Sequence, residues 1–317
     1  MKFEVSSQIP RIKILGLGKA GLNLLECFKN LGLSGIEFIH LDTPPLPSSS
    51  FLHLPLPPLE EKIKESSLKK DLSPFLEGGE LFLILAGLGG DISQKYLLPL
   101  VREIKSGEGL VIVAGILPFD FEGKLKITRA QQLRKILAQE ADALLIFSNN
   151  WYYRLFYNSP LNEFFTQVNK EITGILGGII EPLLSPTYLP LDFPTLKKII
   201  EEGGEVVLGW GEREGENRSH KVIDDIISCP SWQDINPRQI RRILISVQCG
   251  EDLTMQELTK ICEAVTLRIN PDALIAISAV VKQELENRLK VILLGIKTFK
   301  KKLISEIPVL EERGTLC

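Results

Sequence analysis

The chain has 317 residues, of which 44% are hydrophobic and 24% charged, so it is long enough for two domains, each with its own core. The net charge of −3 argues against a general nucleic-acid binder, and the sequence has neither the roughly eighteen-residue apolar run of a membrane span nor a signal-peptide pattern. Five scattered cysteines, never spaced C-x-x-C, favour reduced thiols and a cytoplasmic protein. The histidines at 40, 53 and 220 suggest no metal site.

Residues 11–25 predict a strand, a glycine turn and a helix, in that order. Residues 12–15 form an apolar run broken by one lysine, the turn GLGKAG follows at 16–21, and leucines then recur at helical spacing. Glycines let the backbone approach a phosphate, and the free N–H groups at the start of a helix point at its charge. This stretch therefore predicts an anion site.

The same glycines fit the pattern G-x-G-x-x-G, which binds dinucleotides when an acidic residue follows about twenty residues later. Asp42 stands at that distance, after a second strand predicted over 36–41. A pattern this short leaves three alternatives open: a dinucleotide site, a site for another nucleotide, or a plain tight turn between strand and helix.

The rest of the first half alternates strands and helices. Residues 44–58, rich in proline and serine, predict an extended loop, and residues 59–72 predict a charged surface helix. Further elements are expected as strands at 81–85, 109–116 and 143–147, a second glycine turn at 86–90, helices over 92–105 and up to 140, and a long helix over 161–184. This alternation is typical of an α/β fold with a doubly wound parallel sheet.

The carboxyl ends of the predicted strands gather the residues suited to bind a ligand. Ligands of doubly wound sheets lie at those ends. Both glycine turns, Asp42-Thr43, residues 118–122 and Asn149 fall there. This convergence predicts a binding site more strongly than any single motif.

After residue 186 the pattern changes and predicts a second, smaller α/β domain. A short helix is expected over 192–202. The elements that follow are strands at 205–208, 242–247, 273–280 and 288–296 and helices at 216–228 and 254–268.

Seven segments of this chain, in this order, resemble the FtsZ family, the bacterial relatives of tubulin. They are IKILGLGKAGLN, LAGLGG, LPFDFEG, LDF with its following helix, GWGEREGENR, ISCP with QDI, and ILISVQCGEDLTMQEL, and the resemblance as a whole covers about residues 11–297. The resemblance implies a tubulin/FtsZ-like fold with a nucleotide-binding domain including a core helix (1–184), a connecting loop and helix (185–204), a second α/β domain (205–297), and a short basic linker with a C-terminal peptide (298–317).

The resemblance also implies a function. Members of this family bind GTP, hold GDP after hydrolysis, and assemble head to tail into filaments for cell division, with the second domain of one subunit completing the nucleotide site of the next. For this chain it implies self-association or association with an FtsZ paralogue, in the cytoplasm at the division site. It also allows Mg²⁺ to be bound with the nucleotide. A nicotinamide-dependent oxidoreductase remains a further alternative, although such an enzyme would not carry the second half of this chain.

The nucleotide-binding positions carried over from the resemblance come from both glycine turns, three further loops and the long helix. Glu122 matches the residue that holds the ribose, Lys126 stands where an arginine is usual, and Asn169 with Lys170 match the positions that read guanine. The full set is Gly18, Lys19, Ala20, Gly21, Leu22, Asn23, Asp42, Thr43, Gly87, Gly89, Gly90, Asp91, Ile92, Ser93, Pro118, Glu122, Lys126, Asn149, Asn169 and Lys170.

The second glycine turn departs from the family signature G-G-G-T-G-T-G, because residues 89–95 read GGDISQK. Asp91 brings a negative charge toward the phosphates, which costs on the order of 1–4 kcal/mol for like charges 4 Å apart. Lys19 or Lys95 could offset it, and the alternative is that both are solvated surface lysines.

Lys170 also departs from the family, because it can only donate hydrogen bonds where an aspartate normally accepts them from guanine, which leaves the base preference open.

The hydrolysis loop of the family, N-x-D-F-x-D, reads PLDFPT at 190–195. Asp192 and Thr195 are the candidate catalytic residues, but a threonine cannot act as a carboxylate base. We therefore expect slow or absent GTP hydrolysis. The alternative for Asp192 is a helix N-cap with Pro194 in the first turn. The alternative for the whole protein is a non-hydrolysing structural or regulatory partner of a normal FtsZ paralogue.

The C-terminal residues Glu306, Ile307, Pro308, Val309 and Leu310 look similar to the family peptide that docks onto membrane-anchoring partners. An ordinary frayed terminus is the alternative. The lysine run at 300–302 would add about 1 kcal/mol per lysine against anionic lipid, which does not anchor the protein alone.

Overall fold

A computed structural model describes residues 9–44, 51–59, 65–184, 187–201 and 203–297, with residues 65–69 described through their backbone alone. The predicted C-terminal peptide and lysine run lie outside these residues. Within the described part of the chain, none of the helices is both long and apolar enough to cross a membrane.

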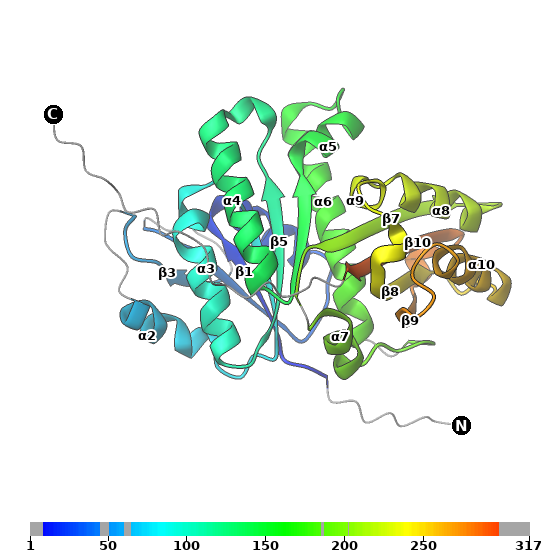
Figure 1. Cartoon of the computed structure of the whole chain (residues 1–317), viewed down its shortest axis with the longest axis horizontal. Helices are drawn as coiled ribbons and strands as arrows, with labels where there is room; N and C mark the ends of the chain where they lie inside the picture. The colour runs from blue at the N-terminus through cyan, green and yellow to red at the C-terminus, as the bar shows by residue number, and fades with distance from the viewer. Residues whose placement is uncertain (1–8, 45–50, 60–64, 185–186, 202, 298–317) are drawn as a thin grey trace.

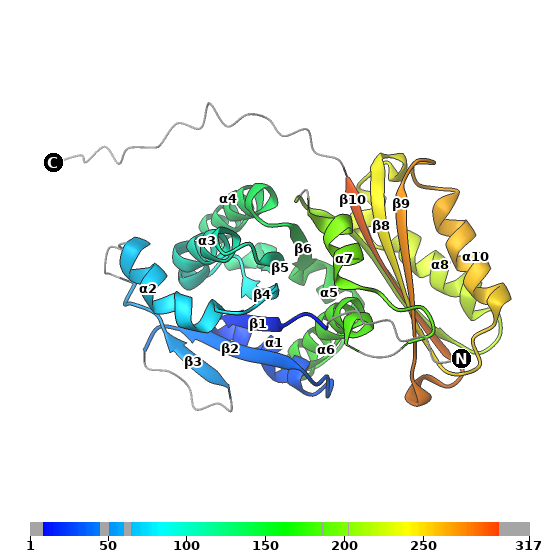
Figure 2. The ribbon, with the colours of Figure 1, turned by 90° about the horizontal axis from the view of Figure 1, so that it is seen from below.

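The first domain is built on a six-stranded sheet in which every neighbouring pair of strands is parallel. In spatial order the strands are β3 (Leu52–Pro55), β2 (Ile36–Asp42), β1 (Ile12–Leu17), β4 (Leu81–Gly87), β5 (Leu110–Leu117) and β6 (Ala143–Ser148). One face packs on α1 (Gly18–Lys29) and the core helix α6 (Leu161–Ile180), and the other on α2 (Glu65–Leu76), α3 (Asp91–Ser106) and α4 (Lys124–Glu140) (Figure 2).

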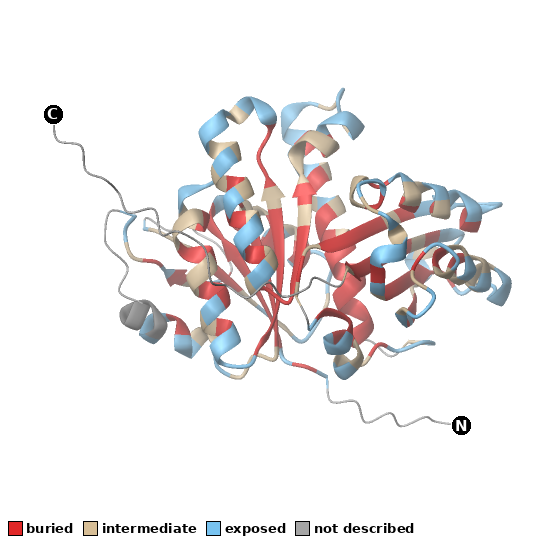
Figure 3. Cartoon of the chain, in the orientation of Figure 1, coloured by how far each residue is buried: buried red, intermediate tan, exposed pale blue. Residues whose placement is uncertain are grey.

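The inner strands are apolar along their whole length because helices cover both of their faces. All six residues of β1 are buried, including Lys13. Its ammonium group donates to the Phe75 carbonyl at 2.9 Å and lies 3.1 Å from a Glu37 carboxylate oxygen. The lysine inside the predicted apolar run is thus a buried charge with partners, as burial requires. Figure 3 shows the buried residues concentrated in the strands and on the inward faces of the helices.

The second domain is a mixed four-stranded sheet in which β8 and β9 are parallel and the other pairs antiparallel. Its strands, in spatial order, are β7 (Val206–Glu214), β10 (Arg288–Lys297), β8 (Ile240–Cys249) and β9 (Leu274–Val281). The outer face packs on α8 (Arg218–Ser228) and α10 (Met255–Thr266), and the inner face on α6 and α7 (Phe193–Ile200). The core helix therefore lies between the two sheets (Figures 1 and 2).

Short helical segments complete the chain. They are α5 (Asn149–Leu155), α9 (Pro230–Gln233), and the 3₁₀ turns η1 (Asp120–Glu122), η2 (Glu181–Leu183), η3 (Pro237–Gln239) and η4 (Gln283–Leu285). The observed architecture confirms the predicted α/β fold, with a doubly wound parallel sheet, a long core helix and a smaller second α/β domain.

Three local predictions need correction. The stretch predicted as an extended loop contains the short edge strand β3, in which Pro55 is tolerated because it is the last residue of an edge strand. The core helix ends at Ile180 and continues as a 3₁₀ turn, since Pro182 has no N–H to extend the α-helical bonds. Helix α5 follows β6 directly, where only a loop was expected.

Candidate functional site

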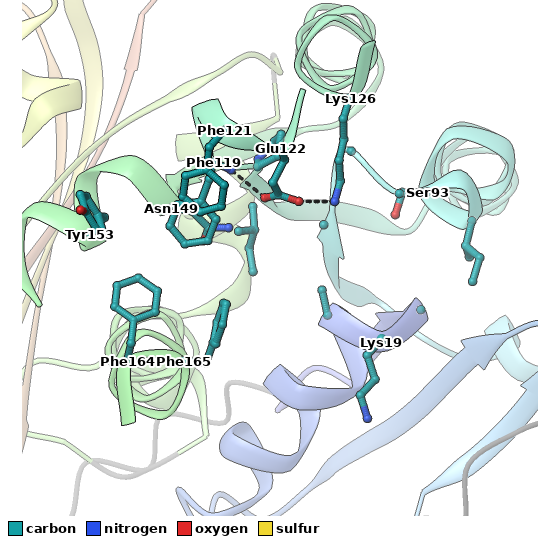
Figure 4. A pocket seen from close by; sticks show the side chains of 18 of the residues that line it. Lys19, Ser93, Phe119, Phe121, Glu122, Lys126, Asn149, Tyr153, Phe164 and Phe165 are labelled. Carbon is teal, nitrogen blue, oxygen red and sulfur yellow. Dashed lines mark hydrogen bonds and ion pairs between the residues drawn. The ribbon is translucent and has the colours of Figure 1, made fainter. Parts of the chain in front are cut away.

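A cavity of about 870 Å³ opens at the carboxyl end of the first sheet. The two glycine turns line one side of it, and aromatic side chains from η1, α5 and α6 line the other (Figure 4). Of the carried-over positions, the cavity brings together thirteen: Gly18, Lys19, Ala20, Gly87, Gly89, Gly90, Asp91, Ile92, Ser93, Pro118, Glu122, Lys126 and Asn149.

The first glycine turn leads directly from β1 into α1. Gly18 is the first residue of the helix and has a φ of +66°, a conformation that residues with a side chain rarely adopt. Gly21 serves packing, because a Cβ added there would lie 2.5 Å from the Gly16 carbonyl carbon. Gly21 and Leu22 are buried and do not line the cavity; they hold α1 close to the sheet. Asn23 also lies outside the lining residues.

The second glycine turn leads from β4 into α3, which starts at Asp91. Gly89 lies against Lys126, where an added Cβ would come within 2.7 Å of the lysine Cγ. The Ile92 side chain lies 3.6 Å from the position of a Cβ on Gly18, so it packs across the first turn. The two turns are therefore in contact, and the N-termini of α1 and α3 face the same cavity.

The charge of Asp91 is offset by a residue that the sequence did not indicate. Its carboxylate accepts from the Arg129 guanidinium of α4 at 3.0 Å. Lys95 instead donates to the carbonyls of Pro58 and Leu59, each at 2.8 Å, so it is not the compensating cation. Lys19 is exposed and lines the cavity.

Glu122 and Lys126 form an ion pair on the rim of the cavity (Figure 4). The second oxygen of Glu122 accepts from the Phe119 N–H at 2.8 Å, which ties the carboxylate to the loop after β5. The acidic and basic residues that line the cavity are Lys19, Lys126, Asp91 and Glu122, and their charges cancel. The attraction of this site for an anion therefore rests on backbone N–H groups and helix N-termini rather than on excess positive charge.

Sequence reasoning missed the aromatic wall of the cavity. Phe119 and Phe121 stack with their ring centroids 4.7 Å apart, and Phe119 meets Phe165 edge to face at 6.3 Å. Phe164 and Tyr153 complete this wall. The available signal was the aromatic pair in LPFDFEG, at a strand end, together with the pair that opens the long helix.

Besides Gly21, Leu22 and Asn23, four further carried-over positions do not line the cavity: Asp42, Thr43, Asn169 and Lys170. Asp42 accepts from the Thr43 N–H at 2.7 Å. Lys170 is exposed on α6 and lies near Cys27 of α1, where its charge opposes the burial that raises the pKa of that thiol. Asn149, expected in a loop at the end of a strand, is the first residue of α5 and does line the cavity.

Asp192 and Thr195 belong to the start of α7, which lies at the end of the molecule opposite the carboxyl ends of the first sheet (Figure 1). The Asp192 carboxylate accepts from the Thr195 N–H at 2.7 Å and forms the N-cap of α7. The structure thus supports the alternative interpretation of Asp192 as a helix N-cap. Within one chain the two candidate catalytic residues do not reach the cavity.

Fold and site together define a two-domain protein of the tubulin/FtsZ fold with an open cavity at its two glycine turns. A sequence model described as "FtsZ family, C-terminal domain" matches residues 204–297. The cell division protein FtsZ of Coxiella burnetii is 25% identical over 91% of this chain and 79% of its own length, and FtsZ 2 of Methanocaldococcus jannaschii is 27% identical over 91% and 80%. The chain is thus similar to FtsZ proteins along nearly its whole length, at about a quarter identity, and its second domain matches the model of the family's C-terminal domain.

Solved structures agree on the fold. An empty FtsZ dimer from M. jannaschii superposes with a TM-score of 0.80 at 22% identity, covering 92% of this chain and 89% of that one. A GTPγS-bound protofilament of CetZ2 from Haloferax volcanii superposes with a TM-score of 0.73 at 18% identity, covering 90% and 92%. The second sheet and these matches leave the nicotinamide-dependent reading without support.

Proposed function

We propose that this protein binds GTP in the cavity and assembles head to tail into filaments in cell division. The observation that carries the proposal is the convergence of two glycine turns and two helix N-termini, α1 and α3, on one cavity of about 870 Å³. Helix N-termini bind phosphates through free N–H groups and the helix dipole. The GTPγS-bound protofilament of a structural relative supports this choice of ligand.

The aromatic wall supports the binding of a flat base opposite the phosphates. Phe121 is 77% exposed and stacks on Phe119, so it offers a ring face at the cavity. Glu122 would hold the ribose after giving up its present partners, Lys126 and the Phe119 N–H. Both carboxylates that line the cavity are in ion pairs, so Mg²⁺ would enter this site bound to the phosphates of the nucleotide. Asn169 and Lys170 remain predictions as base-reading residues.

The placement of Asp192 and Thr195 supports head-to-tail assembly. They lie at the end of the molecule opposite the cavity, so only a second subunit could bring them to the nucleotide (Figure 1). We propose weakened hydrolysis because Asp192 already caps α7 and Thr195 offers a hydroxyl in place of a carboxylate. Losing one catalytic group costs roughly a hundredfold in rate.

Sedimentation with and without GTP tests assembly, and phosphate release at several protein concentrations tests turnover. We expect GTP-dependent pelleting, with turnover at least a hundredfold below an ordinary FtsZ measured in parallel. The variant Gly89→Val serves as a control with an altered cavity lining, because its side chain would displace Lys126. Turnover equal to that of the ordinary FtsZ would refute weakened hydrolysis, and pelleting that ignores GTP would refute nucleotide-driven assembly.

A second candidate function is that of a structural or regulatory partner of an FtsZ paralogue, which keeps the fold and does not hydrolyse nucleotide. The capped state of Asp192 favours it. Nucleotide extracted from purified protein separates the two candidates: stoichiometric GTP or GDP supports the first, and empty protein that co-pellets with an ordinary FtsZ supports the second. For either we propose a cytoplasmic location at the division site, with residues 306–310 as a docking peptide for a membrane-anchor protein.

A further inference from the structure

A buried histidine contacts the first glycine turn from the neighbouring strand. His40 lies on β2, opposite Gly16 of β1 and His53 of β3 in the register of the sheet. Its side chain is fully buried. Its Nε2 lies 3.3 Å from the carbonyl oxygen of Gly18, the first residue of α1.

The hydrogen bonds of His40 fix its tautomer. A carbonyl oxygen only accepts, so the Nε2 of His40 must carry the proton that it donates to Gly18. In the neutral ring Nδ1 then has a lone pair, and it lies 3.1 Å from Nδ1 of His53. His53 must therefore donate from its own Nδ1. This contact selects the tautomer of His40 that reaches the glycine turn.

The Gly18 carbonyl determines where the next N–H group points. In a trans peptide the C=O and the following N–H point in opposite directions. A donor that holds the Gly18 oxygen toward β2 consequently turns the Lys19 N–H away from β2. Gly18, Lys19 and Ala20 all line the cavity, so this peptide plane belongs to the surface that would face a phosphate.

We propose that His40 is a positioning residue for the phosphate-binding turn: it holds the Gly18–Lys19 peptide so that its N–H faces the ligand, and His53 keeps it in the required tautomer. This inference rests on the proposed binding of GTP for its functional consequence. His40 touches the turn and not the cavity, since it is absent from the lining residues. It acts through the backbone of Gly18.

The surroundings of His40 favour its neutral form at the pH of the cytoplasm. Burial lowers its pKa most strongly, and the neighbouring His53 lowers it further. The Gly18 carbonyl, Asp42 on its own strand and Glu26 on α1 act in the opposite direction, and the net pKa is below the ordinary value. A proton added at Nδ1 would face the N–H of His53, so the arrangement is intact while His40 stays neutral.

The test compares His40→Leu, which removes the donor, with His40→Gln, whose amide nitrogen reaches the place of Nε2. His220→Leu is the matched control, since this third histidine is exposed on α8 in the second domain. The probe is a fluorescent GTP analogue titrated by anisotropy. We expect roughly tenfold weaker binding for His40→Leu, the value of one hydrogen bond, and binding within about twofold of wild type for His40→Gln and His220→Leu.

A ligand-free measurement separates this inference from the proposed function. Hydrogen exchange of the amides in residues 17–22 should quicken at least fivefold in His40→Leu and His53→Leu and stay unchanged in His220→Leu. Exchange and affinity that are the same in His40→Leu as in wild type would overturn the positioning role. If His40→Leu shows the exchange effect but wild-type protein never binds the GTP analogue, the nucleotide function is overturned and the positioning of the turn stands.

Discussion

Replacing Asp91 by asparagine removes one negative charge from the rim of the cavity without changing the size of the side chain. The Asp91 carboxylate lies 3.0 Å from the Arg129 guanidinium, and the two side chains are 70% and 44% exposed. An exposed pair of this kind contributes at most about 1 kcal/mol to folding. We therefore expect stability to change little and the affinity for a triphosphate to rise.

The size of the gain follows from Coulomb's law. Two like charges 4 Å apart repel by about 1 kcal/mol in water and about 4 kcal/mol at the dielectric of a protein surface. The high exposure of Asp91 favours the lower figure, which corresponds to roughly fivefold tighter binding. Arg129→Gln leaves Asp91 without its partner and should weaken binding by a similar factor.

Anisotropy titration of a fluorescent GTP analogue at about 50 mM and 1 M salt measures both effects. The differences between variants should shrink at 1 M, where the screening length falls to about 3 Å. Urea unfolding of the same variants checks that folding is intact. Equal affinities of wild type, Asp91→Asn and Arg129→Gln at low salt would mean that this ion pair does not face the bound phosphates, and the electrostatic reasoning would fail.

Three further predictions concern stability. Asp192→Ala should lose about 1 kcal/mol in urea unfolding because it removes the N-cap of α7, while Asp192→Asn should lose little; equal losses would contradict the cap. Tyr152→Phe should leave the free energy of unfolding unchanged or raised by about 1 kcal/mol, because the hydroxyl is buried without a hydrogen-bond partner among the described residues; a clear loss would point to a bound water. The pKa of His40 is lowered in the folded state. The stability that neutral His40 contributes to the fold is therefore present above the unfolded pKa of about 6.5 and is lost as the pH falls. Between pH 6.5 and 5 the free energy of unfolding should therefore fall by up to about 1.4 kcal/mol per pH unit more in wild type than in His40→Gln. Parallel profiles of unfolding free energy against pH would refute this.

The strands and the two glycine turns could be predicted because their signals are local. An apolar run of five to eight residues between turns indicates a buried strand without knowledge of the neighbouring strands. Glycine at position 18 is favoured by the positive φ of that residue itself. The Asp192 cap is equally local, since the carboxylate and the N–H that it accepts from are three residues apart. The short strand β3 was missed because its pairing with β2, rather than its composition, defines it.

The amino-acid sequence by itself determined the order of the elements, the end of the sheet where the cavity lies, and the departures from the FtsZ pattern in the second turn and in residues 190–195. The tertiary structure decided which charges meet. Arg129 rather than Lys95 neutralises Asp91, and His40 reaches Gly18 from the neighbouring strand. These partners are separated by 38 and 22 residues, so no spacing in the chain encodes them. They follow from the packing of α3 on α4 and from the register of β2 beside β1, which only the folded chain sets.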